Sequence, residues 1–99
     1  MKELELFYLR GCPYCVKARN AIDQLLEENP AFGEVAIRWI EESEEPELAG
    51  SRDYYYVPAL FYGENKLYEA DPAHDYNKIK EEIRSAFASV PQADFLQLF

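Results

Sequence analysis

Two cysteines separated by two residues are the side chains of this sequence best suited to chemistry. Cys12 and Cys15 enclose Pro13 and Tyr14, and they follow a short apolar segment that ends before Gly11. A thiol attacks a disulfide only as its thiolate, and the unpaired N–H groups at a helix N-terminus stabilise that anion. Three residues of helix bring both sulfurs to one face, so Cys15 can attack a mixed disulfide formed at Cys12. The pattern predicts disulfide exchange, with Cys12 as the nucleophile and Cys15 as the resolving thiol.

A cysteine pair of this spacing can also be half of a metal site, which ordinarily takes four ligands from Cys, His or carboxylate groups. His74 is the one histidine, and there is no second cysteine pair. The count speaks against a structural zinc site within one chain, so we expect no bound metal or other cofactor. A metal or cluster shared between two chains stays open as an alternative, in which the protein is a non-enzymatic carrier.

The charge balance narrows the range of partners. The 99 residues include 10 Lys and Arg against 19 Asp and Glu, which gives a formal net charge of −9. We therefore expect neither nucleic acid nor an anionic membrane surface as a partner. No apolar run reaches the roughly 18 residues of a membrane span, and the N-terminus lacks the residue order of a signal peptide. These features predict a cytoplasmic protein.

Positive charge gathers around the cysteines in spite of the acidic composition. Arg10, Lys17 and Arg19 lie within residues 8–22, a segment that contains no acidic residue. Positive charge near a helix N-terminus favours a thiolate, and it also favours an anionic thiol substrate. We therefore expect Arg10 to support the thiolate of Cys12. The alternative is that the three cations are ordinary solvated side chains.

The elements around the cysteines follow a strand–helix–strand order. Residues 4–9 are mostly apolar and stop before a glycine, which predicts a buried strand ended by a turn. From Pro13 onward apolar residues recur on one helical face, and Asn29-Pro30 ends the helix. Residues 35–40 predict a second strand. Two strands joined through one helix normally form a right-handed parallel crossover, so the cysteines lie where the first strand meets the helix.

The second half of the chain completes an α/β domain in the order βαβ(α)ββα. A short helix, a hairpin of two antiparallel strands and a last helix are predicted there. Residues 1–90 are expected to form one domain. Residues 91–99 are an apolar tail, which we expect to pack on this domain or on a partner chain, with a monomer as the expected state. The predicted segments are residues 46–49, 59–62, 66–70 and a helix between Asp75, its expected N-cap, and Pro91.

The motif Cys12-Pro13-Tyr14-Cys15 resembles that of dithiol glutaredoxins, which belong to the thioredoxin superfamily. A second similarity is Val57-Pro58, which resembles the Val-Pro before a strand of that superfamily. The resemblance covers residues 3 to about 88 and implies a thioredoxin-like, three-layer α/β fold with a four-stranded mixed sheet. It also implies a cis bond before the proline, although X–Pro bonds in folded proteins are cis in only about 5–6% of cases. The substrate-binding residues that it implies are Arg10, Pro13, Tyr14, Val57 and Pro58.

The resemblance implies a thiol–disulfide oxidoreductase that reduces protein disulfides or glutathione mixed disulfides by dithiol exchange. Glutathione would then be a co-substrate, and disulfide-containing proteins and a reductase would be partners. Two departures keep another electron donor open. Leu9 stands where glutaredoxins usually carry Lys or Arg, and Glu69 and Asp71 lie in a segment where glutaredoxins carry glycines. These carboxylates would repel glutathione unless they turn away. The alternative is a thioredoxin-like protein disulfide reductase that does not use glutathione.

Two further segments differ in composition from the rest of the chain. Tyr54, Tyr55 and Tyr56 precede Val57, and such rings either pack in the core and its rim or form a wall of the substrate groove. The acidic residues 41–47 are expected to form a solvated connection.

Overall fold

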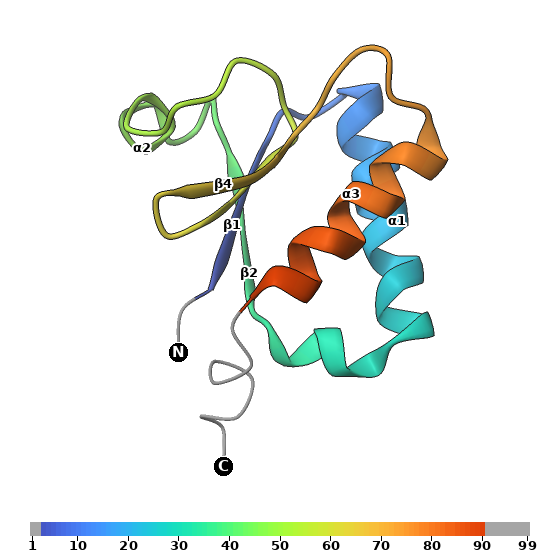
Figure 1. Cartoon of the computed structure of the whole chain (residues 1–99). Coiled ribbons are helices and arrows are strands. Elements are labelled where there is room, and N and C mark those ends of the chain that lie inside the picture. The colour runs from blue at the N-terminus through green and yellow to red at the C-terminus, as the bar shows by residue number, and fades with distance from the viewer. Residues whose placement is uncertain (1–2, 91–99) are drawn as a thin grey trace.

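The strands and helices of the chain follow the predicted order (Figure 1). The computed structural model describes residues 3–90, so the predicted packing of residues 91–99 lies outside the described part. One element, a 3₁₀ helix directly after the first α-helix, has no counterpart among the predicted segments. The elements are β1 (Leu4–Tyr8), α1 (Pro13–Glu28), the 3₁₀ helix η1 (Pro30–Glu34), β2 (Ile37–Glu41), α2 (Pro46–Gly50), β3 (Ala59–Tyr62), β4 (Asn65–Glu69) and α3 (Tyr76–Ser89).

The four strands form one mixed sheet in the order β2-β1-β3-β4. β1 and β2 are parallel, with Tyr8 opposite Glu41, and α1 makes the crossover between them. β1 and β3 are antiparallel, with Phe7 opposite Ala59, and β3 and β4 form the predicted hairpin. The carboxyl end of β1 therefore meets the start of β3 at one edge of the sheet. This edge brings together the segment that follows β1 and the segment that precedes β3.

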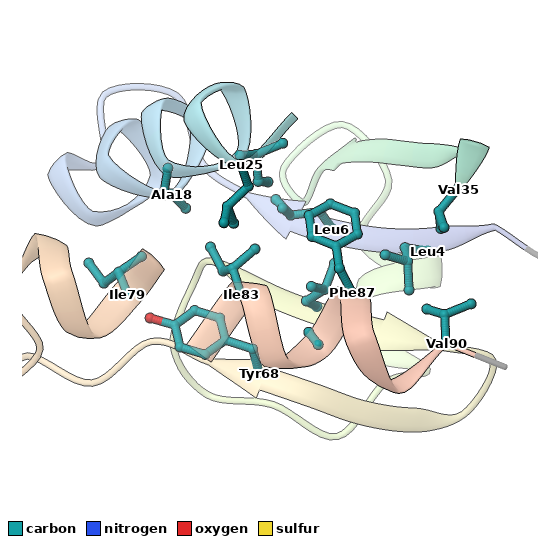
Figure 2. Close-up of a cluster of buried hydrophobic side chains, with 14 residues drawn as sticks. Leu4, Leu6, Ala18, Leu25, Val35, Tyr68, Ile79, Ile83, Phe87 and Val90 are labelled. Carbon is teal, nitrogen blue, oxygen red and sulfur yellow. The ribbon is translucent and has the colours of Figure 1, made fainter. Parts of the chain in front are cut away.

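One face of the sheet is covered by α1 and α3 (Figures 1 and 2). Its apolar side chains come from alternate positions of β1 and from positions three or four apart on the two helices. Each large apolar side chain removed from water in this layer stabilises the fold by roughly 1.5–3 kcal/mol. The buried residues of this layer include Leu4, Leu6, Ala18, Ala21, Ile22, Leu25, Leu60, Tyr68, Ile79, Ile83, Ala86 and Phe87.

The opposite face of the sheet carries a thinner layer, made of α2 and the residues that precede β3. Phe7 and Phe61 pack there, because neighbouring positions of a strand point to opposite faces. The ring of Tyr54 stacks on Phe7 with 5.1 Å between ring centroids. Burial, followed by the nearby charge of Glu42, raises the pKa of Tyr54 to about 12. The helices on one face, the mixed sheet and this thin layer are the three-layer α/β fold that the resemblance implies.

Local sequence signals set where the helices begin. Pro13 occupies the first turn of α1, where a missing N–H costs no hydrogen bond. The Asp75 side chain accepts the Lys78 N–H at 2.8 Å and caps α3 as predicted. Gly11 has a φ of 81°, a conformation open to glycine, and lets the chain turn from β1 into α1.

Within residues 3–90, no helix combines the length and the apolar surface that crossing a bilayer requires.

Replacing Phe87 by alanine tests the layer between the sheet and the helices. The Phe87 ring is fully buried and stacks on Phe32 with 5.0 Å between centroids. We expect Phe87→Ala to lower the free energy of unfolding by about 3–5 kcal/mol in urea titrations, because it leaves a cavity. Tyr55→Ala removes a ring that lies almost entirely in solvent and should change the same quantity by at most about 0.5 kcal/mol. Equal losses in the two variants would contradict the assignment of Phe87 to the core.

Candidate active site

Cys12 lies at the N-terminus of α1 as its capping residue. Its backbone is extended, with φ −75° and ψ 120°, and its sulfur accepts the N–H of Cys15 at 3.3 Å. That N–H is one of the unpaired donors that begin a helix, so the sulfur also sits at the positive end of the helix dipole. Part of the side chain is open to solvent. The Cys12 sulfur therefore combines a position at the start of α1 with access from solvent.

Cys15 lies one turn inside α1 and is only 8% exposed. Burial raises the pKa of its thiol to about 12, because a thiolate loses its hydration there. The two cysteines thus have different surroundings although they are neighbours on one helix, and both are free thiols. Among the described residues, no three His, Cys, Asp or Glu side chains are grouped as a metal ion would require.

Val57 lies directly beside Cys12, although the two residues are 45 positions apart in the sequence. The Val57 carbonyl oxygen is 3.8 Å from the Cys12 sulfur. The peptide bond between Val57 and Pro58 is cis, as the resemblance implies. The Pro58 carbonyl accepts the N–H of Ala70, so the residue that follows β4 holds this turn in place.

Pro13 and Tyr14 occupy the first turn of α1 between the two cysteines. Pro13 is exposed, whereas Tyr14 is half-buried. The Tyr14 hydroxyl donates to the Pro72 carbonyl at 3.1 Å, and the Lys17 ammonium lies 5.4 Å from the centre of its ring. Tyr14 therefore ties the cysteine motif to the connection between β4 and α3.

Arg10 stands near Cys12, but its charge is engaged by carboxylates. Its guanidinium pairs with Glu44 and lies 3.9 Å from the Glu41 carboxylate. The backbone N–H of Arg10 donates to the same Glu41 carboxylate at 3.0 Å. Among the three cations of residues 8–22, Arg10 is therefore countered by acidic residues at and after the end of β2. Lys17 and Arg19 instead lie over aromatic rings, those of Tyr14 and Trp39. The expectation of a fully solvated connection over residues 41–47 is accordingly wrong for Glu41, which is 6% exposed.

Glu41 is a residue of the site that the sequence interpretation missed. One of its carboxylate oxygens accepts the Arg10 N–H, and the other accepts the N–H of Ser43 at 2.8 Å and its hydroxyl at 2.6 Å. These hydrogen bonds lower the pKa of Glu41, and the one from the Ser43 hydroxyl has the largest effect. The carboxylate thereby joins the end of β2 to the turn that carries Cys12. The signal available in the sequence was its place at the carboxyl end of a parallel strand.

Glu69 and Asp71 use their carboxylates within the protein. Glu69 accepts the N–H groups of Tyr55 at 2.7 Å and of Tyr56 at 2.9 Å, and it pairs with Lys66 at 2.7 Å. Although burial opposes its ionisation, the Lys66 ammonium and these two N–H groups leave the pKa of Glu69 below its usual value. Asp71 accepts the N–H of Ala73 at 2.8 Å. Both carboxylates are therefore occupied by backbone donors around the site.

Comparison with known proteins identifies the fold. No protein-family model and no curated protein matches the sequence. Among solved structures, thioredoxin 1 from Thermosipho africanus superimposes with a TM-score of 0.56 at 15% identity, covering 87% of this chain and 94% of that one. A mutant thioredoxin from Halobacterium salinarum superimposes with a TM-score of 0.55 at 26% identity, covering 89% of this chain and 76% of that one. The chain therefore has the thioredoxin fold, and Cys12 and Cys15 fit a CxxC protein of the thioredoxin superfamily, which supports a thiol–disulfide oxidoreductase.

Proposed function

We propose that this chain is a glutaredoxin-type reductase that uses Cys12 to reduce protein disulfides or glutathione mixed disulfides. The observation that carries the proposal is the arrangement of the two thiols. The partly exposed Cys12 sulfur accepts a hydrogen bond from the Cys15 N–H, and the Cys15 thiol is buried one helical turn further along α1. Disulfide exchange needs an accessible thiolate and a second thiol within reach of the mixed disulfide. We also propose that the protein acts in the cytoplasm and as a monomer.

The exchange proceeds in two balanced steps. The Cys12 thiolate attacks one sulfur of the substrate, so that a bond to Cys12 forms while the substrate disulfide breaks, and the departing sulfur takes a proton. Cys15 then loses its proton and attacks the Cys12 sulfur, which closes the Cys12–Cys15 disulfide and frees the second substrate sulfur. Two electrons have passed to the substrate. An external thiol, either glutathione or a protein dithiol, returns them to the cysteine pair.

Val57 supports the approach of the substrate. It precedes β3 and lies next to the Cys12 sulfur, and within residues 3–90 its N–H has no hydrogen-bond partner. An extended substrate segment can pair with this backbone as an added strand, which aligns its disulfide with the nucleophile. Pro58 cannot donate a hydrogen bond, so the paired segment would be confined to the residues around Val57.

The choice of electron donor rests on the charges around the site. Glu69 and Asp71 are bound to backbone N–H groups, so the repulsion of glutathione expected from them is reduced. This supports glutathione as co-substrate. The pairing of Arg10 with Glu44 removes a free cation that would attract glutathione carboxylates. This ion pair favours the second candidate, a thioredoxin-like reductase that takes electrons from a protein.

The unequal surroundings of the thiols predict unequal alkylation. With iodoacetamide at pH 7, we expect Cys12 to react faster than Cys15 by about tenfold or more, since Cys12 is open to solvent at the helix end. Burial holds the pKa of Cys15 near 12, so its labelling should stay slow at pH 9 and increase only in more alkaline solution. Mass mapping after a short pulse measures both rates. Equal labelling at pH 7 would overturn the assignment of roles.

Serine variants of the two cysteines separate the two candidate donors. Cys12→Ser should abolish turnover of every disulfide, because Cys15 is buried and burial raises the pKa of its thiol. Cys15→Ser should retain much of its activity on a glutathionylated protein when glutathione and its reductase are present, since external glutathione can replace the resolving thiol. Coupled turnover and mass spectrometry measure these outcomes. Trapped protein adducts without turnover would support the thioredoxin-like candidate, and wild-type turnover in Cys12→Ser would exclude both.

A further inference from the structure

Large apolar side chains gather at the surface around Cys12. Within residues 3–90, those that are at least about a third exposed are Tyr55 at 89%, Tyr56 at 56%, Val16 at 54% and Leu9 at 36%. The Leu9 carbonyl accepts the Cys12 N–H, and the Val16 N–H donates to the Cys12 carbonyl. Single exposed apolar residues are normal, whereas a group at one place marks an interaction surface. We call these four residues the apolar rim.

The two tyrosines reach the rim from the segment before β3. They directly precede Val57, whose carbonyl oxygen lies 3.8 Å from the Cys12 sulfur. At the edge of the sheet that Figure 1 shows, this segment and the turn between β1 and α1 come together. Contacts therefore connect Cys12 to both parts of the rim, to Leu9 and Val16 on its own segment and through Val57 to the two tyrosines.

The tyrosines of the rim are held in an outward position. The Glu69 carboxylate binds the N–H groups of Tyr55 and Tyr56, and Lys66 holds that carboxylate from its other oxygen. The preceding residue, Tyr54, is anchored on Phe7 in the thin layer. The backbone is thus fixed so that Tyr54 packs inward while the next two rings lie in solvent. A surface fixed before binding loses less entropy when a partner docks.

Two shallow hollows continue the rim toward α2. The first has a volume of about 450 Å³; Tyr54 and Tyr55 line it, and its two charged residues, Glu42 and Arg52, have opposite signs. The second shares Pro46 with it, has a volume of about 360 Å³, and includes three carboxylates in its lining. Glu44 and Glu45 pair with Arg10 and Arg38, so Glu47 is the one of the three that has no ion pair among the described residues. The residues that line the second hollow are Glu44, Glu45, Pro46, Glu47 and Leu48.

Resting on the proposed function, we propose that the apolar rim docks a polypeptide disulfide of a particular composition. The reacting cysteine has an aromatic or long aliphatic neighbour that packs on Tyr55 and Tyr56, and a Lys or Arg a few residues away lies over Glu47 in the second hollow beside α2. Apolar area on the rim matches the first feature, and charge complementarity matches the second. Glutathione offers no large apolar side chain and carries a net negative charge, so it leaves this surface uncovered.

Four short peptide disulfides of equal length test the docking surface. The residue next to the cysteine is Phe or Ser, and a residue further along is Lys or Glu. We expect the intact protein to reduce the Phe peptides with a kcat/KM about tenfold above that of the Ser peptides, the effect expected for burial of one aromatic side chain. Lys should be preferred over Glu, and this preference should shrink with added salt.

Variants locate these preferences on the surface. Tyr55→Ser combined with Tyr56→Ser should bring the Phe-to-Ser ratio close to one, whereas Tyr55→Phe combined with Tyr56→Phe should keep it. Glu47→Gln should weaken the preference for Lys. Glu64→Gln is the matched control, because Glu64 lies in the turn between β3 and β4 at the opposite end of the strands, and it should leave that preference unchanged.

A small neutral disulfide, hydroxyethyl disulfide, separates the two levels of the proposal. Its reduction in a Cys12-dependent reaction, together with equal kcat/KM values for the four peptides, would overturn the docking surface and leave the proposed function standing. No reduction of any disulfide would overturn the proposed function itself. A Phe-to-Ser ratio that survives in the double serine variant would also overturn the assignment to Tyr55 and Tyr56.

Discussion

The hydrogen bond from the Cys15 N–H to the Cys12 sulfur depends on the geometry of the first turn of α1. The sulfur can accept this hydrogen bond only if α1 begins immediately after Cys12. The first N–H groups of the helix then have no backbone acceptor and are available to the sulfur. Pro13 fits that first position, and Gly11 provides the positive φ for the turn before it. Parallel pairing of β1 with β2 then fixes where the helix starts relative to the sheet. The reacting sulfur is thus placed by backbone constraints more than by side-chain contacts.

Carboxylates have an unexpected role in this acidic protein. Glu41, Glu69 and Asp71 each accept backbone N–H groups in segments that surround the cysteine motif. A carboxylate that accepts such donors forms charge-assisted hydrogen bonds, which are stronger than those between neutral groups. Loops that would otherwise expose unpaired N–H groups are fixed in this way. Part of the negative charge of the chain therefore stabilises the loops of the site and is not simply a solvated surface.

Local sequence patterns predicted most elements, and tertiary contacts decided what they missed. The apolar period of α1 and the Asp75 cap of α3 depend on nearby residues, so they could be read directly. Val35 was expected in the second strand, yet it follows the 3₁₀ helix η1, because a short apolar stretch alone does not define where a strand begins. The partners of Arg10 come from 31 and 34 residues away, beyond the reach of local patterns. The cysteine pair was visible from spacing, whereas Pro58 and its cis bond came from resemblance alone.

The unequal thickness of the two layers over the sheet has a consequence for motion. α1 spans 16 residues and α3 spans 14, and both bury a full apolar face, whereas α2 has five residues, far fewer than the roughly 12–15 that an isolated helix needs. α2 keeps its shape through Leu48 and Ala49, which pack beside Phe7. Segments with few buried contacts open locally at a lower free energy than the core. We therefore expect the layer of α2 to open locally at a lower free energy than the layer of α1 and α3, so that the start of α1 is the more stable wall of the site.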